Sequence, residues 1–135
     1  MAKALGTTDA ITICDCCGKS DLKLTVAIEL DDGQIVYYGR ICASRNTGKA
    51  PKVINSEIKA EALRKLLAAQ AEWAKHPANA AERARFDERD QLARTTGQRM
   101  LGMVAADFVR DAVEVARAAR SEIAGRFGVS TWSLA

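Results

Sequence analysis

The cysteines are the residues of this chain best suited to do chemistry, and all four lie in its first third. Cys14, Cys16 and Cys17 stand close together, and Cys42 follows about one hairpin later. Cys14 and Cys17 form a C-x-x-C pair, and Gly18 comes directly after it. This spacing lets two thiolates turn toward one metal ion, while glycine relieves the backbone of a tight turn. The sequence therefore predicts a small head organised by Zn²⁺.

An even number of cysteines also allows disulfide bonds. A reducing cytosol disfavours them, and the neighbouring Cys16 and Cys17 are poorly placed to bridge each other. Metal binding is therefore the favoured interpretation, although a head without metal stays open, because the predicted hairpin brings apolar residues of its own.

Structural zinc takes four protein ligands, and Cys14, Cys17 and Cys42 supply three. Cys16 is the favoured fourth ligand because it is local, provided that the turn accepts neighbouring thiolates. His76 would serve if the first long helix folded back on the head, and water is a third choice. The alternatives are that Cys16 packs as a small apolar residue and that His76 merely ends a helix.

The segment after the first three cysteines has the pattern of a β-hairpin. Apolar residues recur at every second position from Leu22 to Leu30, as in a half-buried strand. The turn 31–34 contains Asp-Gly, which is typical of hairpins, and 35–38 returns as the partner strand. We also expect a loose start over 1–12, a short strand at 11–13, a short helix at 41–47 stopped by Gly48, and a linker at 48–55 that Pro51 keeps from being helical.

Beyond residue 55 the chain is rich in alanine and charged residues, which favours helices. We expect them over 56–75, ended by His76-Pro77, over 79–94, and from about 101 to Gly125. The segment 95–98 has the form of a capping box, which either starts the third helix or interrupts a longer one. Two apolar stripes are expected to face the core: Ile58, Ala62, Leu63, Leu66, Leu67, Ala69 and Trp73, and then Leu101, Val104, Phe108, Ala112, Val115, Ala119 and Ile123.

A basic segment surrounds Cys42. The net charge of +3, from 20 basic and 17 acidic residues, is too small to indicate nucleic acid by itself. From residue 40 to 52, however, no acidic residue interrupts the basic ones, and a neighbouring tyrosine could stack on a base. The candidate nucleic-acid contacts are Arg40, Arg45, Lys49, Lys52 and Tyr37. A solvated basic surface with one packed tyrosine is the alternative interpretation.

Little in the chain indicates an enzyme. One histidine excludes multi-histidine metal catalysis, there is no G-x-S-x-G, and 47–50 lacks the residues of a phosphate loop. The hairpin after Cys17 argues against a thioredoxin-type redox role. Without a bilayer-spanning run or the features of a signal peptide, the chain is expected to be cytoplasmic and not to bind a membrane.

The order of a C-x-x-C-G knuckle, a hairpin and a later cysteine resembles zinc-ribbon and treble-clef heads. It is also similar to small prokaryotic and phage proteins with a C-x-x-C-G-K knuckle, a hairpin and a Tyr-Gly-x-x-Cys-Ala segment. The matching residues, within 13–48, are Cys14, Cys17, Gly18, Lys19, Tyr38, Gly39, Cys42 and Ala43. In treble-clef heads the helix usually supplies two ligands, spaced three residues from each other. Here the residue three positions after Cys42 is Arg45, which cannot bind zinc.

The sequence thus predicts an α+β chain with a zinc-stabilised β-hairpin head, residues 1–54, and an alanine-rich helical body, residues 55–135. The leading hypothesis is a non-catalytic zinc-binding protein that contacts nucleic acid through the head and its basic segment. The alternative is a protein–protein adaptor or inhibitor that acts through the helices, with zinc purely structural. A homo-oligomer would add burial to a chain with 5% aromatic residues, through Phe108, Val115, Ile123 and Trp132.

Overall fold

The fold is mixed α+β, as the sequence predicts. The computed structural model describes residues 2–97 and 102–134, apart from the side chain of Met103. The chain divides into two compact units, Met1–Arg64 and Lys65–Ala135, and the division falls within helix α2 (Pro51–Lys75). The boundary proposed from the sequence, between residues 54 and 55, lies in the first turns of the same helix.

The first unit contains an antiparallel sheet in the order β1-β2-β3. Strands β2 (Thr25–Glu29) and β3 (Ile35–Tyr38) form the predicted hairpin, with Val26 opposite Tyr38. In its turn the amide of Leu30 donates to the carbonyl of Gln34 at 2.8 Å, and Gly33 has a φ of +84°, which glycine adopts without strain. The Asp-Gly signal therefore identified the turn correctly.

Strand β1 (Lys3–Thr8) is not predicted by the sequence, which instead suggested a loose start and a strand at 11–13. β1 pairs with β2, with an irregularity between Ala4 and Gly6, so the head is a three-stranded sheet and not a hairpin alone. The expectation failed because β1 lacks alternating large apolar residues, and Ala4 is buried despite its size. Residues 11–13 lie in an exposed loop.

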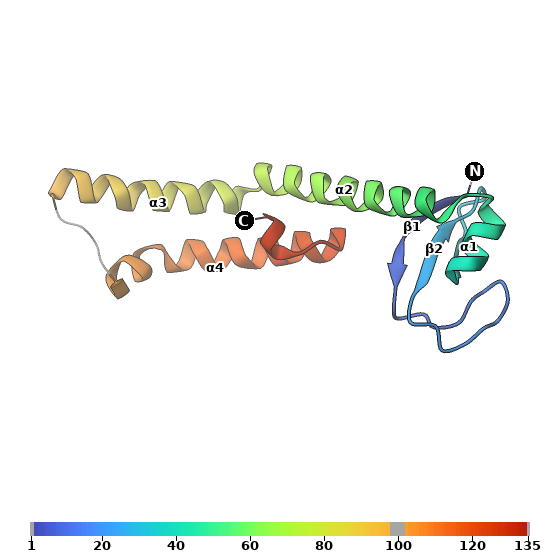
Figure 1. Ribbon diagram of the computed structural model, residues 1–135. Helices are drawn as coiled ribbons and strands as arrows, with labels where there is room; N and C mark the ends of the chain where they lie inside the picture. Colours follow the sequence, from blue (N-terminus) through green and yellow to red (C-terminus); the bar gives the residue numbers. More distant parts are fainter. Residues whose placement is uncertain (1, 98–101, 135) are drawn as a thin grey trace. The chain divides into compact units, whose positions relative to one another are not determined.

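Helix α1 (Arg40–Thr47) follows β3 directly and ends at Gly48, as predicted. The linker is shorter than expected, because α2 already begins at Pro51. Proline is tolerated at the first helical position, where its missing N–H would be unpaired anyway. Figure 1 shows α1 and the beginning of α2 beside the sheet. The buried core of this unit comes from β1, β2, α1 and α2 and comprises Ala4, Val26, Ile28, Ala43 and Ile54.

Ion pairs connect the beginning of the chain to α2 within the first unit. The ammonium group of Lys49 pairs with the Glu57 carboxylate and donates to the carbonyl of Ala2 at 2.6 Å. The other oxygen of Glu57 accepts from the amide of Ala4 at 3.0 Å. One turn later, the buried Glu61 carboxylate pairs with Lys3 at 3.2 Å and with Arg64 at 2.6 Å. These contacts hold β1 against the helix.

We expect the first unit to lose stability as the pH falls from about 4.5 to about 2. Hydrogen bonds from Arg64 lower the pKa of Glu61, burial raises it, and a hydrogen bond from Lys3 lowers it further. The resulting pKa is about 2. Burial would raise the pKa of Glu57, but the Lys49 ion pair and the Ala4 amide lower it. Lowered folded-state pKa values stabilise the fold above the ordinary value of 4.5, and this contribution is lost as protonation proceeds.

Glu61→Gln should therefore cost about 1–2 kcal/mol at pH 7 after allowance for the exposed partners, and less at pH 3. Urea unfolding at the two pH values measures this difference. Glu29→Gln serves as the control, because it removes a carboxylate on β2 that takes part in none of these ion pairs. If Glu61→Gln and the wild type have the same free energy of unfolding at both pH values, the prediction is wrong.

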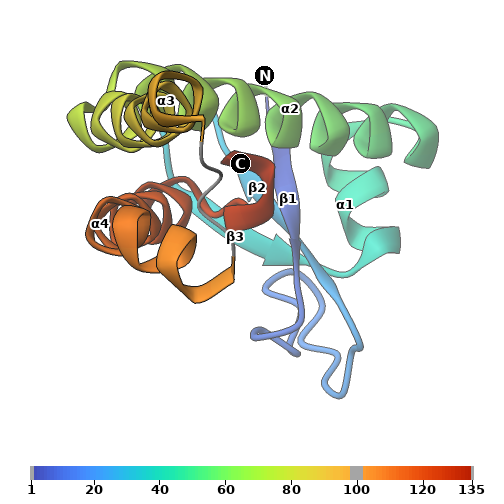
Figure 2. The same cartoon turned by 90° about the vertical axis from the view of Figure 1, so that its left-hand side faces the viewer.

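The second unit contains α3 (Pro77–Thr96), α4 (Gly102–Phe127) and the short 3-10 helix η1 (Thr131–Leu134). Helices α3 and α4 lie side by side (Figures 1 and 2). The break at His76-Pro77 is where the sequence predicts it, and the imidazole Nδ1 of His76 caps α3 by accepting from the Ala78 amide at 3.0 Å. The core comprises Ala69, Trp73, Ala78, Ala116, Ala119, Ile123, Ala124 and Leu134.

The predicted stripe of α4 has the right period but is partly wrong in phase. Val109 and Ala116 are buried, whereas Val104 and Val115 are exposed, and Leu101 lies outside the described residues. On α2, Leu63 and Leu67 are likewise exposed. Helix α3 continues to Thr96, so Thr95 does not start a helix, and Gln98 lies outside the described residues. None of the helices in the described part of the chain has both the length and the hydropathy needed to cross a membrane.

Candidate metal centre and the basic hollow beside it

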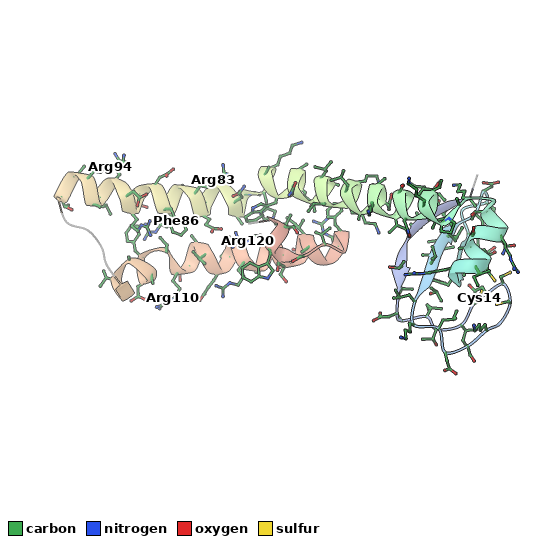
Figure 3. The ribbon with its side chains drawn as sticks, viewed as in Figure 1. Cys14, Arg83, Phe86, Arg94, Arg110 and Arg120 are labelled. Atoms are coloured by element: carbon green, nitrogen blue, oxygen red, sulfur yellow. The ribbon has the colours of Figure 1, made fainter. Side chains whose placement is uncertain are left out.

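Three cysteines meet at one point of the first unit. The Sγ atoms of Cys14, Cys17 and Cys42 all lie within 4.8 Å of one another. Cys14 is buried and belongs to the loop between β1 and β2, whereas Cys42 lies in the first turn of α1. Figure 3 shows sulfur atoms gathered near Cys14 beside α1. The hairpin and the short helix thus bring together thiols that are distant in the sequence.

Backbone hydrogen bonds fix the loop that carries Cys14. The amide of Cys14 donates to the carbonyl of Lys19 at 3.0 Å, and the amide of Gly18, with a φ of +72°, donates to the carbonyl of Cys14 at 2.9 Å. Asp15 attaches the same turn to β3: its amide donates to the carbonyl of Tyr37, and its carboxylate accepts from the Tyr37 amide, both at 2.8 Å. Asp15 is therefore engaged by the sheet.

The surroundings of Cys14 favour its thiolate. Burial would raise the pKa of Cys14, but backbone amides of Cys17, Gly39 and Cys16 donate hydrogen bonds that lower it to about 7. The amide of Gly39 is 3.2 Å from the sulfur. Hydrogen bonds to the thiols of Cys17 and Cys14, together with burial, raise the pKa of Cys42 to about 12. A cation that binds the cluster must therefore displace protons.

Cys16 stands beside this cluster and is exposed. Its sulfur accepts a hydrogen bond from Nδ2 of Asn46 at 3.2 Å, and the same Nδ2 donates to the carbonyl of Cys42 at 2.8 Å. The Cys16 thiol is also one of the hydrogen-bonding groups that act on Cys42. Of the other fourth ligands considered, His76 belongs to the second unit, where its ring stacks on Trp73.

The donor set is suited to a metal that prefers sulfur. Three converging thiols, one of them receiving backbone N–H···S hydrogen bonds, are compatible with metal binding. Thiolates select soft or borderline ions such as Zn²⁺ over Mg²⁺ or Ca²⁺. The cluster therefore agrees with the expectation of a metal centre.

A hollow of about 720 Å³ opens beside the cysteines, and Cys14, Cys17 and Cys42 form part of its lining. Four cationic side chains also line it: Lys19, Lys23, Arg40 and Arg45. No acidic residue does, and none of the four forms an ion pair with another residue that the structure describes. In the second unit, by contrast, Arg120 pairs with Glu82 at 2.9 Å.

The structure separates the predicted nucleic-acid contacts from one another. Arg40 and Arg45 line the hollow, whereas Lys49 is engaged by Glu57. Lys52 is exposed on the first turn of α2, and Tyr37 is half-buried in β3, both outside the lining of the hollow. Sequence reasoning missed Lys19 and Lys23, which lie close to the C-x-x-C-G knuckle. Their proximity to the cysteines was the available signal, but Asp21 stands between them and breaks the basic run.

The residues considered for self-association differ in how far they are exposed. Ile123 is buried within the second unit, and the guanidinium of Arg85 covers the ring of Phe108 at 3.7 Å from its centroid. Val115 and Trp132 are exposed, Trp132 to 87%. Figure 3 shows Arg83 and Arg94 on the side of α3 away from α4, and Phe86 between the two helices.

Fold and site together define a small mixed α+β protein with a cysteine cluster that is compatible with metal binding. Comparisons with protein-family models, with curated proteins and with solved structures found no match for the chain. The function has therefore to be inferred from the residues of this chain and their surroundings.

Proposed function

We propose that the chain is a small, non-catalytic zinc protein of the cytoplasm whose head binds nucleic acid at the basic hollow. Cys14, Cys17 and Cys42 would hold Zn²⁺, with Cys16 as the nearest further thiol. The metal would join the cysteine loop to α1 and so hold both sides of the hollow. The order of knuckle, hairpin and helix is the feature on which the resemblance to treble-clef heads rests, although Arg45 stands where such heads place a second helical ligand.

The observation that carries the proposal is the concentration of cations that form no ion pair within the described part of the chain. Lys19, Lys23, Arg40 and Arg45 line one hollow, and none of the carboxylates that the structure describes lines it with them. Grouped cations repel one another and gain most from a ligand that presents several negative charges. Phosphates at regular spacing meet this requirement, and their neutralisation releases counterions, which makes the binding depend on salt.

Fluorescence anisotropy with labelled oligonucleotides tests the proposal. With up to four phosphates neutralised, the affinity should fall about 50- to 150-fold between 50 and 200 mM salt. The variant Lys19→Gln/Lys23→Gln/Arg40→Gln/Arg45→Gln should lose most of this binding and of its salt dependence. Retained metal content and an unchanged circular dichroism spectrum would show that the variant is folded.

Lys52→Gln/Lys59→Gln is the matched control. Both lysines are exposed on α2 outside the hollow, so their replacement should leave the affinity within a fewfold of the wild type. Salt-independent binding, or a hollow variant that binds as well as this control, would remove the basis of the proposal.

A second function, as an adaptor that binds a protein through the helical unit, is favoured by Trp132. Its exposed ring lines a hollow of about 390 Å³ together with Arg117, Arg120, Ser121 and Thr131. Large exposed aromatic residues beside arginine are typical of protein interfaces. If this is the function, Trp132→Ser abolishes capture of the partner while the four substitutions in the hollow are silent.

A further inference from the structure

We infer that the hollow accepts a single strand, with a base against its aliphatic residues and the flanking phosphates against its cations. This inference rests on the proposed function and specifies its ligand. Besides the cations, Leu22, Leu24 and Ile41 line the hollow. Ile41 is 68% exposed, and Leu24 is exposed as well. Apolar and cationic groups thus face the same space.

The exposed aliphatic groups distinguish a single strand from a duplex. A duplex presents phosphates and sugars on its outside, and its bases are accessible only as edges in the grooves. Against such a surface, Ile41 and Leu24 would face charged oxygens. The bases of a single strand can turn outward and cover apolar side chains with their faces, which removes apolar surface from water. Only the single strand satisfies both kinds of group at once.

The origin of the cations agrees with a strand that passes through the hollow. Lys19 and Lys23 come from the loop before β2, whereas Arg40 and Arg45 come from α1. Two separate segments therefore supply charge, as required when phosphates precede and follow a bound base. The volume of about 720 Å³ is also within the usual range of about 300–1,000 Å³ for sites that hold a small organic group.

The test compares ligands that differ in whether bases are present and accessible. The single strand and the abasic strand carry equal charge, whereas the duplex carries twice as much, so charge alone would favour the duplex. A single strand of about 12 nucleotides, the duplex of the same sequence and an abasic strand of the same length are titrated against the metal-loaded protein at one salt concentration. We expect the single strand, as DNA or as RNA, to bind about tenfold or more tightly than the duplex or the abasic strand.

A matched pair of variants locates the base. Ile41→Ser should weaken single-strand binding about fivefold and leave abasic-strand binding unchanged, because only apolar contact is lost. Leu24→Ser should act in the same direction. Ile35→Ser is the control, since Ile35 is 49% exposed on β3 but does not line the hollow.

The possible failures can be told apart. If the duplex or the abasic strand binds as tightly as the single strand, or if Ile41→Ser behaves like Ile35→Ser, the inference is wrong while the proposed function stands. The same holds if polyglutamate of equal charge displaces the single strand, because charge alone then accounts for binding. If no oligonucleotide binds the metal-loaded protein, the inference and the proposed function fall together.

Discussion

The Cys14→Ser protein is expected to purify without stoichiometric metal and with the first unit largely unfolded. The sulfur of Cys14 lies within 4.8 Å of those of Cys17 and Cys42 and accepts the amide of Gly39. Serine would replace the thiolate of a proposed metal ligand with a hydroxyl group, which is a poor ligand for zinc. For structural zinc sites the binding free energy is folding free energy, about 10–16 kcal/mol in zinc-finger peptides, and a sheet of this size has few other sources of stability.

Two measurements check this expectation. Metal content by mass spectrometry, on protein purified without added zinc, should be one per chain for the wild type and near zero for Cys14→Ser. Hydrogen exchange should show that the variant, and the wild type after treatment with a chelator, have lost protection in β2 and β3. Amides of α4 are the internal control, because the second unit has its own core.

Cys16→Ser provides a graded comparison. Because Asn46 holds the Cys16 sulfur beside Cys42, we expect this variant to keep one metal per chain but to release it to a chelator faster than the wild type. If the purified wild type holds no metal and a chelator leaves its melting curve unchanged, the candidate metal centre is refuted.

The parts of the fold that follow from local chemistry could be predicted from the sequence. Asp32-Gly33 sets the turn of the hairpin, Gly48 ends α1, and His76-Pro77 separates α2 from α3. Each of these signals acts within a few residues, through a positive φ or through the missing amide of proline. Such signals do not depend on what the rest of the chain does.

The missed elements depend on tertiary packing. Ala4 and Ala116 are buried, yet alanine is common on exposed helix faces too, so its position carries little periodic signal. This explains why β1 was not predicted and why Val115 was assigned to the wrong face of α4. Pro51 was read as a break, although the same residue is compatible with the first position of a helix.

The candidate site, like the fold, has one part that the sequence predicts and one part that it does not. The spacing of Cys14 and Cys17, with Cys42 after a hairpin, was enough to predict the cluster. A hairpin places the residue that follows its second strand near the residue that precedes its first. The sequence does not show which cations form ion pairs, because the partners are brought together by the tertiary fold. Lys49 lies within the basic run but contacts Glu57, whereas Lys19 lies outside the run and lines the hollow.

Ile28→Ala is expected to destabilise the first unit by about 2–5 kcal/mol. Ile28 is fully buried on β2, opposite Val36, in the core that Ala43 and Ile54 complete. The substitution leaves a cavity that a small sheet cannot close without disturbing its pairing. Urea unfolding of the metal-loaded protein measures the loss.

Ile35→Ala is the matched control, because it removes the same atoms from a half-exposed position of β3 and should cost less than about 1 kcal/mol. The difference also bears on the site. Tyr38 ends β3, and the next residue, Gly39, donates its amide to Cys14. Loosening the β2–β3 pair therefore loosens a hydrogen bond to the cysteine cluster. Ile28→Ala should therefore release metal to a chelator faster than Ile35→Ala does. If the two variants release it at the same rate, the sheet does not support the cluster, and the cysteines hold their arrangement through the loop and α1 alone.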